Sequence, residues 1–240
     1  MSFRRKPKLQ SSGKKAESGT SQRAQSVRVK TAKGRKTSST RWLQRQLNDP
    51  YVQAAQAQGL RSRAAFKIRE LNERFHFLKP DQWVVDLGAA PGGWTCEAVE
   101  IIGSQNGQGK IIAVDIQEME DIAGATVIRQ DFLAAEAEER IVALLNGKAD
   151  GVISDMAPFT TGHKATDHLR IVALVDAAYH FACKILKPGG YFVAKVFQGG
   201  TEGELYADMQ QRFDKVRHAK PPSSRKESPE VFVVATGFKG

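Results

Sequence analysis

Hydrophobic residues follow two different patterns along the chain. From about position 83 onward, short apolar runs alternate with longer amphipathic stretches, whereas the first 38 residues hold few large apolar side chains. The runs are short, rich in β-branched residues and apolar at consecutive positions, which is typical of strands covered on both faces. They read WVVDLG at 83–88, IIAVDI at 111–116, TVIRQD at 126–131, GVISDMAP at 151–158 and YFVAKVF at 191–197.

Helical periodicity fills the spaces between these runs. The strongest predicted helix spans about 167–186, because its apolar residues recur at three- and four-residue intervals and KPGG at 187–190 ends it. Alternating strands and helices predict a doubly wound α/β fold with a mostly parallel sheet. The end differs, because DKVRHAKP at 214–221 and EVFVVATGF at 230–238 are joined by a polar loop. These two runs predict an antiparallel hairpin at one edge of the sheet.

Three short helices are predicted before the first strand. The first is capped by one of the three polar residues at 38–40, and the Asp49-Pro50 pair starts a second that Gly59 ends. Ser62 is the predicted cap of the third helix. Its inward face carries apolar residues at spacings of four, three and four, namely Ala64, Ile68, Leu71 and Phe75.

Charge sets the N-terminal segment apart from the rest of the chain. Residues 1–40 hold twelve Lys or Arg and one acid, a net of +11, so that with +10 for the whole chain the remainder carries −1. Such a segment cannot bury enough apolar surface to offset the entropy of ordering. We therefore predict a disordered basic tail at 1–38, suited to nucleic acid, and one globular domain at 39–240. An organelle transit peptide is the alternative for the tail.

Cysteine usage and hydropathy narrow the range of cellular compartments in which we expect the protein. Cys96 and Cys183 are the two cysteines, and neither has a partner at metal-ligand or redox spacing, so we predict neither a disulfide nor a metal site. The chain has no apolar run near the ~20 residues that span a bilayer and no hydrophobic signal segment. We expect a soluble, cytoplasmic protein with no membrane contact.

The first candidate for ligand binding is the segment DLGAAPGGW at 86–94. In open α/β sheets, ligands lie at the carboxyl ends of the strands, and this segment follows the first strand. Its small residues allow the backbone to approach a ligand closely, and Trp94 is placed to stack on that ligand or to cover it. The alternative is a turn that only satisfies loop geometry. The dinucleotide signature G-x-G-x-x-G is absent, which disfavours NAD.

Acidic residues end three of the predicted strands, at Asp86, Asp115 and Asp131. A single aspartate at a strand end is usually a turn or cap residue. Three in series form an anionic rim, which would attract a positively charged sulfonium and repel a pyrophosphate. The second and third acids are also placed to accept hydrogen bonds from a ribose diol and an adenine amino group.

Together, DLGAAPGGW, the SDMAP after the fourth strand, KPGGYFVAKVFQG and SPEVFVVATGF resemble the FtsJ/RlmE family of ribosomal RNA ribose 2′-O-methyltransferases. The similarity runs in order from about Trp42 to Gly240. It implies a Rossmann-like fold with a seven-stranded sheet and S-adenosyl-L-methionine as the cofactor. It also implies, as the substrate, a uridine 2′-hydroxyl of 23S ribosomal RNA in the A-loop of the large subunit, and a monomeric enzyme. Phe159 departs from the family pattern, in which Asn usually follows Met-Ala-Pro, and the connection around 105–109 is three residues longer.

The resemblance also implies the functional residues. The family's reaction centre of Lys-Asp-Lys-Glu falls here on Lys67, Asp155, Lys195 and Glu230. The family's cofactor contacts fall on Gly92, Trp94, Asp115, Asp131 and Asp155.

The chemistry of these residue types agrees with methyl transfer to an alcohol, which needs a group that removes the hydroxyl proton. Lys195 is the expected proton acceptor, because its apolar strand and a nearby Lys67 would favour the neutral amine. Asp155 and Glu230 would favour the charged form, and we expect them to hold the lysines and the ribose in place. Each residue also has a structural reading: Lys195 as a lysine that reaches water, Lys67 as a surface residue, and Glu230 as an edge charge.

The sequence also allows three alternative functions to be weighed. Relatives of the same fold methylate the ribose of transfer RNA. Base N-methylation is disfavoured, because the fourth strand ends in Asp-Met-Ala-Pro and lacks the Asn/Asp-Pro-Pro-aromatic loop that acts on amino groups. An RNA-binding assembly factor without catalysis would explain the basic tail, but not two lysines and two acids in apolar surroundings.

Overall fold

The computed structural model describes residues 37–158, 161–198 and 203–240, and the chain divides into two compact units at Asn48. In the first unit, helix α1 spans Thr37–Leu47, and the Asn48 side chain donates a hydrogen bond to the Gln44 carbonyl at 2.7 Å. The predicted cap at 38–40 is wrong, because these three residues lie inside the helix. Small polar residues are tolerated there because the N–H groups of a first turn need no helical partner. Most of the predicted tail lies outside the described residues.

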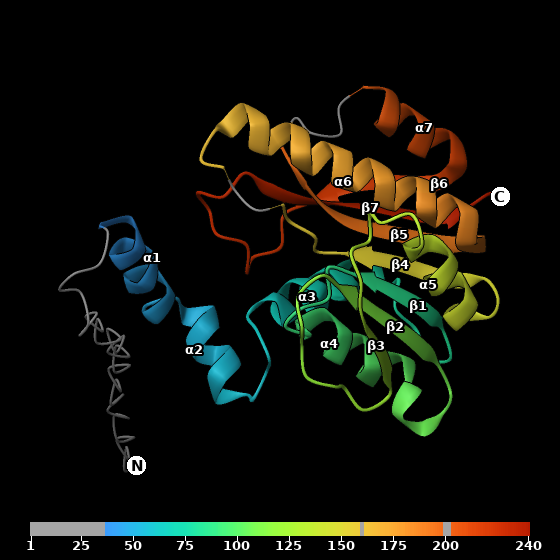
Figure 1. The fold of residues 1–240 in the computed structure, drawn as a ribbon, viewed down its shortest axis with the longest axis horizontal. Helices are drawn as coiled ribbons and strands as arrows, with labels where there is room; N and C mark the ends of the chain where they lie inside the picture. Colours follow the sequence, from blue (N-terminus) through green and yellow to red (C-terminus); the bar gives the residue numbers. More distant parts are fainter. Residues whose placement is uncertain (1–36, 159–160, 199–202) are drawn as a thin grey trace, which may run out of the picture. The chain divides into compact units, whose positions relative to one another are not determined.

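The second unit, residues 49–240, is built on a seven-stranded sheet in the order β3-β2-β1-β4-β5-β7-β6 (Figure 1). The first five strands in the chain pair in parallel, and β7 pairs antiparallel with both β5 and β6. This confirms the doubly wound sheet and the edge hairpin predicted from the sequence. The strands are β1 (Trp83–Leu87), β2 (Lys110–Asp115), β3 (Ala125–Arg129), β4 (Ala149–Ser154), β5 (Leu186–Phe197), β6 (Phe213–Ala219) and β7 (Glu230–Phe238).

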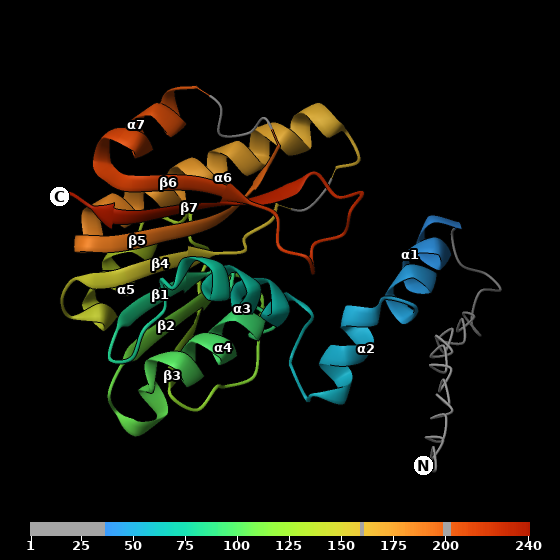
Figure 2. The ribbon, with the colours of Figure 1, turned by 180° about the vertical axis from the view of Figure 1, so that it is seen from behind.

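Helices cover both faces of this sheet (Figures 1 and 2). Adjacent strand residues face opposite sides, so Val84 packs with α3 and α4 while Val85 packs with α5 and α6. Both are fully buried, which explains why the strands are apolar at consecutive positions. The helices of this unit are α2 (Pro50–Ala57), α3 (Ala64–Phe75), α4 (Gly93–Ile102), α5 (Ala137–Leu145), α6 (Lys164–Ile185) and α7 (Glu204–Arg212), with a 3-10 turn at Ser104–Asn106.

Several of the helix ends predicted for the second unit are confirmed, and others are shifted. The Asp49 side chain caps α2 by accepting a hydrogen bond from the Tyr51 N–H at 3.0 Å, and the chain turns with positive φ at Gly59. The predicted cap of α3 is wrong, because Arg63 and not Ser62 is the N-cap residue, although the Ser62 hydroxyl accepts a hydrogen bond from the Ala64 N–H at 3.3 Å. Helix α6 begins three residues earlier than predicted. It ends before KPGG, but pairing with β4 already starts at Leu186, so that KPGG lies within β5.

The thiols of Cys96 and Cys183 are not bonded to each other. Within the described ranges, we find no helix long and apolar enough to span a membrane. The same residues contain no group of three or more His, Cys, Asp or Glu side chains that could hold a metal ion.

Candidate active site

The turn after β1 brings two strand ends close together. Gly88 has a φ of +76°, and a Cβ atom at this position would lie 2.8 Å from the Cα of Met156, which follows β4. Gly92 also has positive φ, +104°, and immediately precedes α4. Glycine is therefore required at Gly88 both by the backbone conformation and by the approach of the neighbouring strand. The turn lies where the strand order reverses between β1 and β4, which is where open α/β sheets bind ligands.

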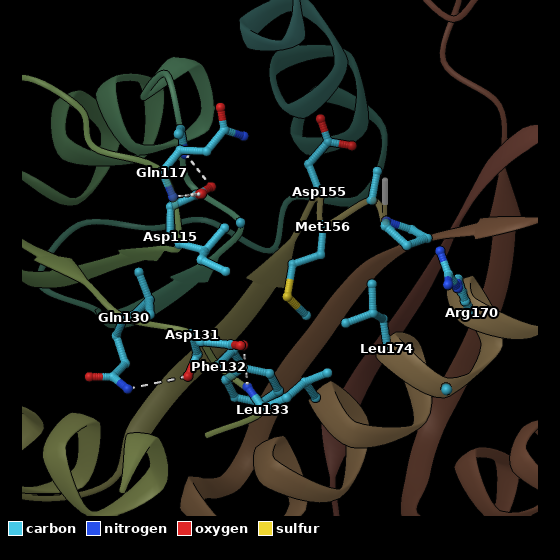
Figure 3. Close-up of a pocket in the computed structure, with 17 residues that line it drawn as sticks. Asp115, Gln117, Gln130, Asp131, Phe132, Leu133, Asp155, Met156, Arg170 and Leu174 are labelled. Carbon is cyan, nitrogen blue, oxygen red and sulfur yellow. Dashed lines mark hydrogen bonds between the residues drawn. The ribbon is translucent and has the colours of Figure 1, made fainter. Parts of the chain in front are cut away.

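A cavity of about 550 Å³ lies at these strand ends (Figure 3). Its wall combines three carboxylates, Asp115, Asp131 and Asp155, with a larger apolar surface. The apolar side chains come from the segments after β2, β3 and β4 and from α6, and include Ile116, Phe132, Leu133, Met156 and Leu174. This combination suits a ligand with a flat apolar part, hydroxyl or amino groups, and a positive charge.

Local backbone groups orient the two acids nearest β2 and β3. Asp115 accepts hydrogen bonds from the Ala90 N–H at 2.9 Å and from the Gln117 N–H at 2.7 Å. Asp131 accepts one from the Leu133 N–H at 3.0 Å (Figure 3). A carboxylate has about four acceptor positions, so each acid keeps capacity for a ligand's hydroxyl or amino group.

The third strand-end acid, Asp86, does not belong to the rim. Its side chain is fully buried behind the glycine turn, where one oxygen accepts a hydrogen bond from the Thr95 hydroxyl at 2.6 Å. The other oxygen has no hydrogen-bond partner among the described residues. Burial raises the pKa of Asp86 to about 7, and the neighbouring charges of Asp155 and Asp115 act in the same direction. The expectation of three rim acids is thus wrong for Asp86.

Trp94 also differs from the expectation. The residue is only 2% exposed, its indole N–H donates to the Ala64 carbonyl at 2.9 Å, and its ring lies 5.6 Å from the Phe232 ring. The indole thus packs in the core between α3 and β7 and is not placed to stack on a ligand in the cavity. Any contact of Trp94 with a ligand there would come from its main chain.

The remaining four predicted residues, Lys67, Asp155, Lys195 and Glu230, meet in one cluster. The Lys67 ammonium lies 2.8 Å from Glu230 Oε2 and 3.7 Å from Asp155 Oδ2. The Lys195 ammonium lies 3.0 Å from Asp155 Oδ1 and donates a hydrogen bond to the Asp155 carbonyl at 2.6 Å. Asp155 therefore joins the two lysines, and it also lines the cavity.

Strand register explains why residues so distant in sequence meet. Ser154 is paired with Ala194 across β4 and β5, which places Asp155 beside Lys195. In the antiparallel pair of β5 and β7, Lys195 lies opposite Phe232, so that Glu230 is its diagonal neighbour on the same face. Helix α3 covers this face and brings the Lys67 ammonium to 5.5 Å from the centre of the Phe232 ring.

Charge in the cluster is balanced, with two ammonium groups and two carboxylates. Their side chains are only 9% to 17% exposed. Ionic groups this far from water are costly unless they are paired, and each of the four has a partner of opposite charge. The cluster thus holds two amines in fixed positions beside a cavity, which suits the transfer of a proton from a bound alcohol.

Sequence reasoning missed the polar groups that surround this cluster. The Ser224 hydroxyl donates a hydrogen bond to Glu230 Oε1 at 2.8 Å, and Glu70 accepts two hydrogen bonds from Ser223. In the sequence, these serines are indistinguishable from other residues of a polar loop.

The reversal of strand order, the glycine turn and the acid-rimmed cavity define a Rossmann-like α/β enzyme of the methyltransferase class. The FtsJ-like methyltransferase family model matches residues 60–238. The chain therefore belongs to this family, and its cofactor is S-adenosylmethionine.

Relatives with high identity carry one name, "Ribosomal RNA large subunit methyltransferase E". The protein of Paramagnetospirillum magneticum is 60% identical over 216 residues, which cover 89% of this chain and 88% of the relative. The protein of Roseobacter denitrificans is 56% identical over 232 residues, which cover 95% and 97%.

Among solved structures, one described as a ribosomal RNA methyltransferase from Plasmodium falciparum matches with a TM-score of 0.66 and 28% identity. The match covers 75% of this chain and 99% of that chain. Phe159, where the family pattern has Asn, lies outside the described residues.

Proposed function

We propose that this chain transfers a methyl group from S-adenosylmethionine to a ribose 2′-hydroxyl of 23S ribosomal RNA, at a uridine of the A-loop. The observation that carries this proposal is the cluster of two lysines and two acids beside the cavity. The names of the relatives, at 56% and 60% identity, support the large ribosomal subunit as the source of the substrate.

The cavity residues fit the cofactor by their chemistry. Asp115 and Asp131 offer carboxylates to the ribose hydroxyls and the adenine, and apolar side chains between them suit the adenine ring. Asp155 offers a negative charge near the methionine part, and Gly92 and Trp94 contribute main-chain groups next to the turn. When bound, the cofactor supplies an electrophilic methyl group on a sulfonium.

In this proposal, the Lys195 ammonium first gives up a proton to the solvent, and the lone pair of the resulting amine accepts the proton of the 2′-hydroxyl. Its amine is held by the Asp155 carbonyl and carboxylate, at 2.6 and 3.0 Å, so that its direction is fixed before the substrate binds. Lys67 adds a positive charge that stabilises the oxygen as negative charge develops on it. Glu230 holds Lys67, and Asp155 keeps the two amines at a fixed separation.

The same proposal includes an oligomeric state and a cellular location for the enzyme. All four side chains come from one chain, which supports a monomer. Ribosomal RNA as the substrate supports a cytoplasmic location, and the basic segment at 1–38 would bind phosphates of the RNA.

Replacing Lys195 tests the role of this residue. We expect Lys195→Ala to lower the single-turnover rate of methyl transfer by about 10² to 10⁴, because the proton acceptor is lost. Cofactor binding, measured by calorimetry, should persist. Lys187→Ala is the matched control, because Lys187 lies at the other end of β5 and also pairs with an aspartate, Asp150. Methyl transfer at the normal rate by Lys195→Ala would remove Lys195 from the role of base.

The substrate is tested by mapping 2′-O-methylation in total RNA from cells with and without the gene. We expect loss of one methyl group in 23S ribosomal RNA, at an A-loop uridine, and its return with the wild-type gene but not with Lys195→Ala. Loss of a transfer RNA methyl group would contradict the proposed substrate. No change in any methyl group would favour an assembly factor without catalysis.

A further inference from the structure

Glu230 is held at both carboxylate oxygens. Oε2 accepts the hydrogen bond from Lys67 at 2.8 Å, and Oε1 accepts the hydrogen bond from the Ser224 hydroxyl at 2.8 Å. The terminal torsion of a glutamate side chain is broad and roughly two-fold, so a single partner would leave the orientation of the carboxylate poorly defined. Ser224 is the second partner, and it is only 5% exposed.

Helix α3 fastens the loop that carries Ser224. Arg63, Lys67 and Glu70 follow one another at spacings of four and three, which places them on one side of α3 and its first turn. Arg63 donates to the Ser223 carbonyl, while Glu70 Oε2 accepts from the Ser223 N–H at 2.8 Å and from its hydroxyl at 2.6 Å. Arg63 and Glu70, which flank Lys67 on this side of α3, therefore hold Ser223, the residue next to Ser224.

A second fastening comes from Asp49, which caps α2 and is 7% exposed. Its carboxylate pairs with Arg63 and with Arg225, the latter at 3.0 Å. Arg225 follows Ser224 directly in the loop between β6 and β7. The loop is thus fixed on both sides of Ser224, and the serine is held facing Glu230.

We propose that Ser224 is a positioning residue for methyl transfer, which acts through Glu230. By occupying Oε1, its hydroxyl leaves Oε2 for Lys67 and keeps that ammonium 3.7 Å from Asp155 Oδ2. Without this hydrogen bond, Glu230 can turn and Lys67 can move toward Asp155. The Asp155 carboxylate also orients Lys195, so the position of the proton acceptor changes as well. This inference rests on the proposed function.

The test measures methylation of 23S ribosomal RNA by Ser224→Ala over a range of cofactor concentrations up to saturation. We expect kcat to fall about ten-fold, as for loss of one hydrogen bond to a charged group, while KM for S-adenosylmethionine stays unchanged. Ser224→Thr should restore much of the rate because it keeps the hydroxyl. Ser223→Ala is the control for the loop: it removes only one of the two hydrogen bonds from Ser223 to Glu70 and leaves Ser224 on Glu230, so kcat should fall clearly less than in Ser224→Ala.

A double-mutant cycle separates positioning from general loop stability. In a Glu230→Gln background, Ser224→Ala should lower kcat by less than a further two-fold, because its effect runs through the Glu230 carboxylate. An equal loss in both backgrounds, an equal loss in Ser223→Ala, or a wild-type kcat in Ser224→Ala would overturn the role of Ser224. Wild-type protein that does not methylate 23S ribosomal RNA would contradict the proposed function, whereas an active wild type with an unaffected Ser224→Ala would contradict this inference alone.

Discussion

Asp86 shows what burial does to a single charged residue in this protein. The carboxyl has one hydrogen bond, from Thr95, and no contact with water, and its pKa rises from an ordinary 3.8 to about 7. Between these two pH values, the folded chain holds a proton that the unfolded chain has lost. Stability conferred by the neutral carboxyl therefore falls as the pH rises from about 4 to about 7 and then stays constant.

Asp86→Asn should remove this pH dependence, because the amide stays neutral and can still accept the hydrogen bond from Thr95. Relative to the wild type, we expect the variant to gain about 2 kcal/mol in free energy of unfolding between pH 5.5 and pH 8.5, from the 1.5 pH units that lie below the folded pKa. Urea denaturation at these two pH values measures the gain. A difference between the two proteins that is the same at both pH values would contradict a raised pKa at Asp86.

At the scale of elements, the segments that follow β1 and β4 approach each other so closely that only a glycine fits at position 88. A methyl group at Gly88 would meet the backbone of Met156, and the residue also has positive φ. We expect Gly88→Ala to lower the free energy of unfolding by about 3 kcal/mol, as the sum of backbone strain and overlap. It should also weaken cofactor binding, because Gly88 lines the cavity.

Gly59→Ala is the matched control for this prediction. Gly59 also has positive φ, +68°, but a methyl group there would meet no atom within 4 Å. Gly59→Ala should lower the free energy of unfolding only by the backbone strain, about 1 to 2 kcal/mol, and leave cofactor affinity unchanged. Chemical denaturation and calorimetric titration of both variants give the comparison. Equal losses in the two variants would mean that the approach of β4 does not constrain the turn.

For the molecule as a whole, the distribution of charge predicts how RNA binding divides between tail and domain. The first forty residues carry a net +11. Deletion of residues 1–38 should weaken RNA affinity and flatten its salt dependence, because the slope falls by roughly 0.7 to 0.9 for every phosphate that the tail no longer neutralises. Binding titrations over a range of salt concentrations measure the slope. A tail of the same length with its Lys and Arg replaced by Gln should behave like the deletion, and an unchanged slope in both would assign the tail another role.

Local patterns along the chain were sufficient for the architecture. Runs such as WVVDLG and YFVAKVF, and the absence of a helix between 221 and 230, predicted the parallel strands and the antiparallel hairpin, because strand and helix periodicities depend on neighbouring residues. The glycine turn was likewise evident in DLGAAPGGW. Lys67, Asp155, Lys195 and Glu230 were identified through the family resemblance, since Lys67 does not differ locally from a surface residue and only Lys195 stands out, by its place in an apolar strand.

The contacts between distant segments needed the tertiary structure. Asp86 and Asp115 both lie at strand ends, yet one is buried behind the turn and the other lines the cavity, because helix α4 covers only the first. Trp94 packs against Phe232, far away in the sequence, and Ser224 reaches Glu230 only because α3 and Asp49 fix its loop. Periodicity specifies which way a side chain faces within its own element. What that side chain meets depends on strand register and on which helix covers the face.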